Sequence, residues 1–384
     1  MISLPGIAET ATWLKKGPLR DFAQPTERSD AHGTTVKKSL TRDDVPVPAL
    51  WKAALELVDL KAGGPGDKVA WWIAFTYKTE PCTLASEKFG VRLYVTTVDE
   101  DQAQKVTTEI TKKVSSAVEA VEKMIESAAP NLFGQGHATV VNQHFHLRHA
   151  YEYFRQRALD PTSIETVTTE RHSADGTFLG ASIADGPARM QVNAVNDLVA
   201  AITAYLSLLE HHLVLALGFQ EFDPPTDNLS AIIGLPWGQK YERILGKGGL
   251  ASTYRVRLTE IVERWRNMYA HGGFEKKHTG SVYLHVQGVG PLPAGLTNVR
   301  SSPLFTLFPA NPTDIADVFS FFDEFDMWLR TTLPEAMAWV ESGLDVRFDQ
   351  KFRDEVADAI AAGEINGLID RTGWLIDRLT NMDF

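Results

Sequence analysis

The sequence NDLVAAITAYLSLLEHHLVLALGF, residues 196–219, decides how the second half of this chain folds. Apolar residues cover nearly every face of a helix drawn through it, so the helix needs apolar surroundings. Its length leaves a membrane span open as an alternative. Glu210, His211 and His212 lie together in its second half, however, and hydrocarbon disfavours charge there. The stretch therefore predicts the central buried helix of a bundle, and we expect no membrane contact.

Amphipathic patterns and strand-like runs follow this central helix. Helices are expected at about 237–246, 250–271 and 311–341. Asn311 and Asp314 suit the start of the last helix, and Pro334 is expected to kink it. Between residues 281 and 310 the runs SVYLHV and PLFTLF resemble strands, interrupted by Gly and Pro.

The first half of the chain has a different pattern. Residues 1 to about 67 are broken by prolines and are expected to be irregular. Two strands are expected at 69–77 and 89–98, followed by an amphipathic helix that Pro130 ends. The fold class is mainly α (α+β overall), in three parts. They are an α+β domain of unknown role (1–190), a helical bundle (191–342) and a short helical tail (343–384).

Composition narrows the classes of protein that this chain can be. It has 384 residues, of which 44% are hydrophobic and 23% charged, as in an ordinary globular protein. Its one cysteine, Cys82, excludes an internal disulfide and fits a reducing compartment. The start, MISLPGIAETATWLKK, lacks a basic head before an apolar run, so no secretory signal is expected. We therefore expect a cytoplasmic protein.

The net charge of −11 excludes attraction of nucleic acid to the chain as a whole. A local exception lies at residues 237–278, where nine basic and four acidic residues give +5 and leave −16 on the remainder. We call this segment the basic island. It is the local patch that a nucleic-acid role requires, although surface helices also alternate charge without any such role.

The helix expected at 250–271 contains part of the basic island and has one apolar stripe. The stripe consists of residues at spacings of three and four: Leu258, Ile261, Val262, Trp265, Met268 and Tyr269. A wheel centred on Leu258 places Asn267 and His271 opposite the core and Arg266 on the flank. Gly272 and Gly273 are expected to end the helix.

The string IVERWRNMYAHGGFEK, residues 261–276, resembles the Arg-Asn-x-x-x-His-Gly segment of Apea-like HEPN proteins of bacterial defence loci. The surroundings agree with that family. The long apolar helix with Glu210 comes first, and a helix with Trp237 and Lys240 lies between. The resemblance covers about 196–342, under half of the chain.

The HEPN resemblance implies a helical bundle that forms a homodimer, with two Arg-x4-His segments meeting in a composite cleft. Many members are metal-independent endoribonucleases, so neither a cofactor nor a metal is expected. His271 would be the general base or acid, Arg266 the phosphate clamp and Asn267 an orienting group. Glu210 would support Arg266. The expected RNA contacts are Lys240, Arg264, Lys276 and Lys277.

The expected function is therefore an endoribonuclease that acts as a toxin or an antiviral defence effector. RNA is its expected substrate, and an antitoxin or another defence-system protein is a further expected partner. The alternative is a HEPN module without catalysis, which dimerises and binds a nucleotide, RNA or protein. A His and an Arg at a helix end also occur without any function, since the helix dipole favours a C-terminal His.

Two other sequence patterns are compatible with a binding site and also with an ordinary structural role. Four histidines lie close in sequence at His137, His144, His146 and His149, where zinc binding and ordinary surface placement are both open. LGKGGL at 245–250 has glycines like a phosphate loop, but no strand precedes it, so a turn between helices is expected.

Overall fold

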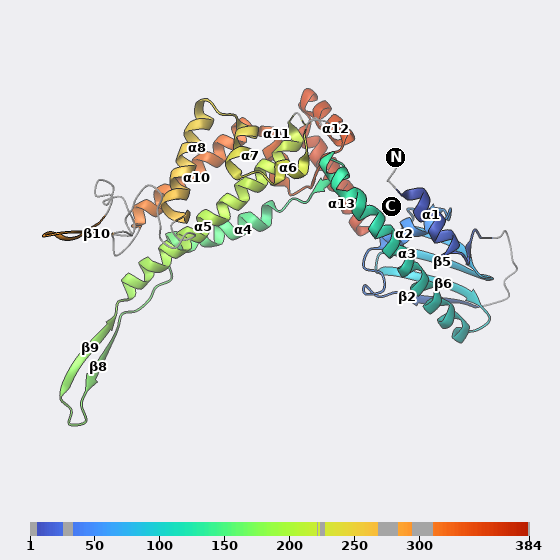
Figure 1. The fold of residues 1–384 in the computed structure, drawn as a ribbon, viewed down its shortest axis with the longest axis horizontal. Helices are drawn as coiled ribbons and strands as arrows, with labels where there is room; N and C mark the ends of the chain where they lie inside the picture. The colour runs from blue at the N-terminus through green and yellow to red at the C-terminus, as the bar shows by residue number, and fades with distance from the viewer. Residues whose placement is uncertain are drawn as a thin grey trace. The chain divides into compact units, whose positions relative to one another are not determined.

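A computed structural model describes residues 6–25, 34–220, 222, 227–267, 283–293 and 310–382. The chain is mainly helical (60%), with an antiparallel sheet region followed by a helical region, which confirms the expected fold class (Figure 1). It divides into two compact units, one of Met1–Gln135 with Asp370–Phe384, and one of Gly136–Ile369. We call them the sheet unit and the helical unit.

The sheet unit is built on an antiparallel sheet with the strand order β1-β4-β5-β6-β2, and β3 pairs with β4. Besides the two predicted strands, β4 and β6, the sheet contains β1, β2, β3 and β5, and β5 passes through Pro81. The strands are β1 (Phe22–Ala23), β2 (Thr34–Ser39), β3 (Ala62–Gly63), β4 (Val69–Tyr77), β5 (Glu80–Glu87) and β6 (Gly90–Thr97).

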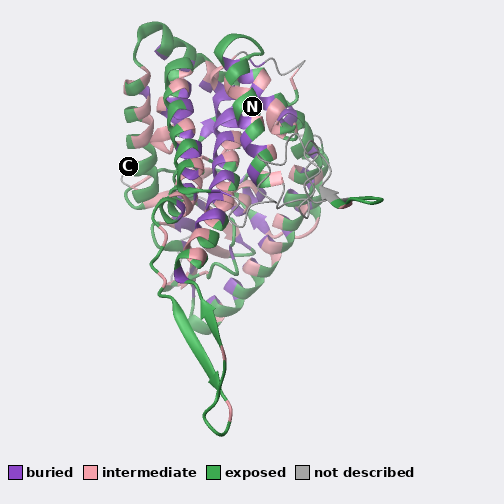
Figure 2. Ribbon diagram, turned by 90° about the vertical axis from the view of Figure 1, so that its left-hand side faces the viewer, coloured by how far each residue is buried: buried purple, intermediate pink, exposed green. Residues whose placement is uncertain are grey.

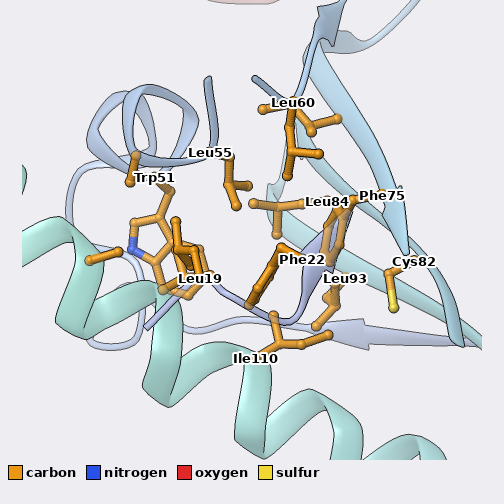
Figure 3. Packing of buried hydrophobic residues seen from close by; sticks show 14 of the residues in the cluster. Leu19, Phe22, Trp51, Leu55, Leu60, Phe75, Cys82, Leu84, Leu93 and Ile110 are labelled. Carbon is orange, nitrogen blue, oxygen red and sulfur yellow. The ribbon is translucent and has the colours of Figure 1, made fainter. Parts of the chain in front are cut away.

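Alternating side chains of this sheet form one face of an apolar core. In β4 the residues Ile73, Phe75 and Tyr77 are buried at every second position, as a half-buried strand requires. Helix α3 (Glu100–Gly134) covers that core, and Figure 3 shows Ile110 of α3 pointing at the sheet residues. Pro130 lies inside α3 rather than ending it, so the helix continues for about one more turn.

The expectation that residues 1–67 are irregular is wrong. They contain strands β1, β2 and β3 and two helices, α1 (Ile7–Lys16) and α2 (Pro48–Glu56). Leu14 of α1 and Trp51 of α2 are each almost fully buried in the core of the sheet unit. Packing of such anchors outweighs the repeated prolines, one of which, Pro48, lies in the first turn of α2 where it fits a helix.

The helical unit is centred on α5 (Gly186–Ala216), as the sequence predicts. Together with the short helix η1 (Leu217–Phe219), α5 is long and apolar enough to cross a bilayer by composition. Yet 56% of its most apolar window is buried within the chain, as in the core helix of a bundle. Helix α4 (His144–Leu159) packs along α5, and the hairpin of β8 (Val167–His172) and β9 (Phe178–Ala184) connects them.

The remaining helices of this unit form a bundle with α4 and α5, in which aromatic rings stack between elements, as Tyr205 does on Phe322 and Tyr241 on Phe325. Pro334 separates α10 (Pro312–Thr332) from α11 (Pro334–Ser342) with a full break at Leu333. Asn311 caps the start of α10 as expected, and its mutual hydrogen bonds with Asp314 form a capping box. The run PLFTLF lies outside the described residues, whereas SVYLHV contains β10. The elements are α6 (Leu229–Ile233), α7 (Trp237–Leu245), α8 (Gly249–Ile261), η2 (Val262–Arg266), β10 (Tyr283–Val286), β11 (Gly290–Pro293), α10 (Pro312–Thr332), α11 (Pro334–Ser342) and α12 (Gln350–Ala362).

The two units differ from the parts expected at 1–190, 191–342 and 343–384. Because α4 packs along α5, residues from Gly136 onward belong with the helices. The short strands β7 (Thr139–Val140) and β12 (Val346–Arg347) pair, which ties the start of this unit to the segment after α11. Helix α13 (Ile365–Asn381) begins in the helical unit and ends in the sheet unit.

Candidate functional site

The candidate site lies at the end of α8, where the apolar stripe predicted from the sequence is present. Leu258, Ile261, Val262 and Trp265 are all buried, with exposed fractions of 6% or less. They hold this face of the helix against the bundle. The last two members of the stripe, Met268 and Tyr269, lie outside the described residues.

A π turn changes the geometry at the end of this helix. η2 is π-helical, and the backbone N–H of Asn267 donates to the carbonyl of Val262, five residues earlier. The wheel predicts that Asn267 lies opposite the core with Arg266 on the flank, but Arg266 is exposed and Asn267 is half-buried. A π turn rotates less per residue than an α turn, which shifts every later side chain. Such turns are frequent at functional sites.

Three of the predicted site residues fall outside the described part of the chain. They are His271, Lys276 and Lys277. Arg266 and Asn267 are thus the described residues of the Arg-x4-His segment, and Asn267 is the last residue of the described range 227–267.

Glu210 and Lys240 lie together, in a way that corrects the roles expected for each. Lys240 of α7 donates to the Glu210 carboxylate of α5, and Lys240 is only 5% exposed. Glu210 therefore supports Lys240 rather than Arg266, and Lys240 does not face solvent as an RNA contact must. The sequence carried a signal for this, since Lys240 shares the buried face of α7 with Tyr241 and Ile244.

Ion pairs neutralise most of the basic island. Arg264 approaches Asp314 of α10 at 3.4 Å and lies over the Trp265 ring. Arg266 differs, because no acidic group of the described residues forms an ion pair with it. Six basic side chains of the island each have an acidic partner: Lys240, Arg243, Lys247, Arg255, Arg257 and Arg264.

Two contacts bring η2, α10 and α5 together at the end of the bundle where Arg266 lies. The Arg264–Asp314 pair joins η2 to the first turn of α10. The side-chain amide of Gln191, near the start of α5, donates to the carbonyl of Ala310 at 3.2 Å, just before α10. The N-terminal parts of α5 and α10 therefore lie at the same end of the bundle as η2, which carries the exposed Arg266.

A buried polar cluster, which the sequence did not predict, lies deeper in the same unit. The Asp326 carboxylate of α10 accepts from the Tyr205 hydroxyl at 2.7 Å and from the Arg148 guanidinium at 2.8 Å. Burial, together with the carboxylate, raises the pKa of Tyr205 well above its usual value. The signal was a carboxylate in the apolar stripe of α10, one turn after Phe322 and three residues before Leu329.

The four N-terminal histidines do not converge. His144 is buried, whereas His137, His146 and His149 are exposed. Throughout the described residues, no three His, Cys, Asp or Glu side chains gather as a metal site would need. His211 and His212 each make a structural hydrogen bond: His211 Nε2 accepts from the backbone N–H of Gln143 at 2.9 Å, and His212 pairs with His144.

Two further features have ordinary structural explanations. The glycines of LGKGGL form the turn between α7 and α8, as expected, and Gly246 and Gly249 have positive φ there. In the sheet unit a cavity of about 530 Å³ has Lys78 and Lys113 in its wall. Internal pairing offsets their charge, since Lys113 binds Asp21 at 3.1 Å and Lys78 binds Glu109 at 2.6 Å.

Comparison with known proteins found no match for this chain. No family model matches the chain, no curated protein matches it, and no solved structure matches it. The HEPN resemblance therefore rests on the residues of the chain alone.

Proposed function

We propose that this chain is a metal-independent endoribonuclease of HEPN type, acting in the cytoplasm as a toxin or defence effector through a composite site between two copies. The observation that carries the proposal is Arg266. It is exposed at the end of a π turn, has no ion-pair partner among the described residues, and precedes His271 by five positions. A guanidinium in that state is available to bind two phosphate oxygens.

The proposed reaction needs no metal ion. The ribose 2′-oxygen forms a bond to the adjacent phosphorus while the bond from phosphorus to the 5′-oxygen breaks. One His271 removes the 2′-hydroxyl proton, and the second copy of His271 gives a proton to the departing 5′-oxygen. Arg266 stabilises the negative charge on the pentacovalent phosphorus intermediate, and Asn267 orients a phosphate oxygen. The products are a 2′,3′-cyclic phosphate and a 5′-hydroxyl.

Cleavage of end-labelled RNA in EDTA tests the proposal. The wild type should cleave, and RNA with 2′-O-methyl groups should resist because it has no 2′-hydroxyl. His271→Ala should slow cleavage by about 10²–10⁴-fold and Arg266→Ala by about 10²–10³-fold. Arg257→Ala removes another exposed guanidinium of the same helix and should keep the rate within about twofold.

The contrary results are equally definite. RNA that stays whole with the wild type, with or without metal, excludes the ribonuclease. A His271→Ala variant that cleaves at the wild-type rate excludes His271 as the proton-transfer group. Light scattering on each variant should show an unchanged mass, which separates loss of chemistry from loss of assembly.

The neutralised basic island favours a second candidate, a HEPN dimerisation and binding module without catalysis. Six internally paired cations leave little charge for a long RNA. This candidate predicts that the wild type binds a labelled nucleotide, RNA or antitoxin-like protein but leaves varied RNAs intact.

A further inference from the structure

The hairpin of β8 and β9, which we call the arm, projects from the helical unit, and its residues are almost all exposed. Every residue of its two strands is exposed except Gly180. Figure 2 shows the arm as a green ribbon extending from the helices. Its exposed side chains include Phe178 (57%), Leu179 (67%) and Ile183 (68%). Large apolar groups in water are costly, so this surface calls for a partner.

The arm nevertheless has a defined geometry at both ends. At its base, the backbone N–H of Gly186 donates to the Thr166 hydroxyl at 3.1 Å. At its tip, the Ser173 N–H donates to the Thr177 carbonyl at 2.9 Å, and the Asp175 carboxylate accepts from the Thr177 N–H. A lone two-stranded hairpin is at best marginally stable in water. Pairing with another strand would therefore stabilise the hairpin in the conformation that these hydrogen bonds already define.

The two free edges of the arm differ in charge. β8 carries Glu170, Arg171 and His172, and charged groups on an edge strand discourage pairing with other strands. β9 reads FLGASIA and has no charged residue and no proline. The edge of β9 is thus the unprotected one, and a neutral, apolar strand is the complement that it fits.

We propose that β9 pairs antiparallel with β9 of a second copy, so that two arms form a four-stranded sheet across a two-fold axis. With Ala181 on the axis, Leu179 of each copy lies opposite Ile183 of the other. A strand that pairs with itself about a two-fold axis uses both free β9 edges, so assembly stops at a dimer. A second β9 supplies the neutral, apolar strand that this edge requires.

The position of the arm agrees with this partner. The arm leads directly into α5, whose N-terminal part contacts the start of α10, and α10 in turn contacts η2. The arm and Arg266 therefore lie at the same end of the bundle. An arm-to-arm dimer can bring two such ends toward each other, although the pairing of the arms requires no ribonuclease activity. The inference thus goes beyond the proposed function.

The test compares charge placed on the β9 edge with charge placed elsewhere. In Leu179→Lys/Ile183→Lys the two cross-strand apolar pairs become pairs of like charges, and we expect the dimer dissociation constant to rise at least tenfold, about 1.4 kcal/mol. Phe89→Lys, at an 83% exposed site in the sheet unit, is the matched control and should dimerise like the wild type. Sedimentation velocity over a concentration series measures the constants, and circular dichroism confirms that each variant folds.

A cross-link provides a second measurement. Ala181→Cys should form a disulfide between two copies under mild oxidation, because the two residues face each other at the axis, whereas Thr168→Cys on β8 should not. A monomeric wild type, a lysine variant that dimerises unchanged, or an Ala181→Cys that stays reduced would each overturn the pairing.

A failure of the proposed β9 pairing can be distinguished from a failure of the proposed ribonuclease activity. A β9 variant that is monomeric and still cleaves RNA at full rate would keep the arm pairing and remove the composite site. A wild type that dimerises through β9 and leaves RNA whole would keep the arm pairing and remove the ribonuclease.

Discussion

The Nδ1 atom of His144 lies 2.9 Å from the Nε2 atom of His212, and both imidazoles are buried between α4 and α5. The rings are stacked, with their centroids 5.1 Å apart. One nitrogen must donate and the other must accept, so the contact requires complementary tautomers. Burial, reinforced by nearby Arg148, lowers the pKa of His144, and burial holds the pKa of His212 well below its usual value.

This pair predicts that the helical unit loses stability in mild acid. In the unfolded chain these imidazoles take up protons near pH 6.5, whereas the folded pair resists protonation until a lower pH. The unfolded state then binds more protons, so the free energy of unfolding falls as the pH drops below about 6.5. The slope is as much as about 1.4 kcal/mol per pH unit for each imidazole. Urea denaturation from pH 8 to pH 5 measures it.

An apolar replacement of the pair gives the control for this pH dependence. His144→Phe/His212→Leu removes both buried imidazoles, so the slope below pH 6.5 should be shallower than in the wild type. His149→Asn removes an exposed imidazole from the same helix and serves as the matched variant. An apolar pair with the full wild-type slope would show that other groups cause the acid sensitivity.

The buried carboxylate of Asp326 gives a second prediction. Asp326→Ala leaves the Arg148 guanidinium and the Tyr205 hydroxyl without their shared acceptor, so it should cost about 3–5 kcal/mol of unfolding free energy. Asp323→Ala, three residues earlier on α10, removes the two hydrogen bonds to Arg155, but its carboxylate is half exposed and should cost about 1 kcal/mol at most. Equal losses in chemical denaturation would contradict a special role for burial.

The sequence predicted the parts of this fold that depend on local pattern. The apolar stripe from Leu258 to Trp265 is buried as expected, because spacings of three and four place those residues on one helix face. The predicted cap at Asn311 is also present, since its hydrogen bond to the Asp314 N–H joins residues only three apart.

The sequence could not predict features set by distant partners. The face that Lys240 shares with Tyr241 and Ile244 indicates its burial, but its partner Glu210, thirty residues earlier, depends on how α5 packs against α7. The π turn before Asn267 shifts the helical register without any proline or glycine to announce it. The arm resembles a joint between domains in sequence, because polar, glycine-rich segments are typical of linkers as well as of hairpins.

The salt dependence of RNA affinity gives a third prediction, best measured in the His271→Ala background so that RNA is not cleaved. Arg266→Ala should reduce the slope of log affinity against log salt by about 0.7, the value for one phosphate contact with a single strand. Lys276→Ala/Lys277→Ala should reduce it by about 0.7 for each of the two lysines that binds a phosphate. Lys240→Met should leave the slope unchanged, because its buried ammonium reaches Glu210 and no phosphate. A lower slope for Lys240→Met would show that Lys240 does bind an RNA phosphate.

The base of the arm gives a fourth prediction. A Cβ added at Gly186 would lie 2.0 Å from the carbonyl oxygen of Ile164, and a backbone atom cannot yield as a flexible side chain does. Gly186→Ala should therefore cost about 1–3 kcal/mol and speed amide hydrogen exchange in β8 and β9. Gly373→Ala has nothing within 4 Å of the new methyl group, lies inside α13, and should stabilise that helix by about 0.5–1 kcal/mol. If both variants leave exchange in the arm unchanged, the close approach at Gly186 does not hold the arm in place.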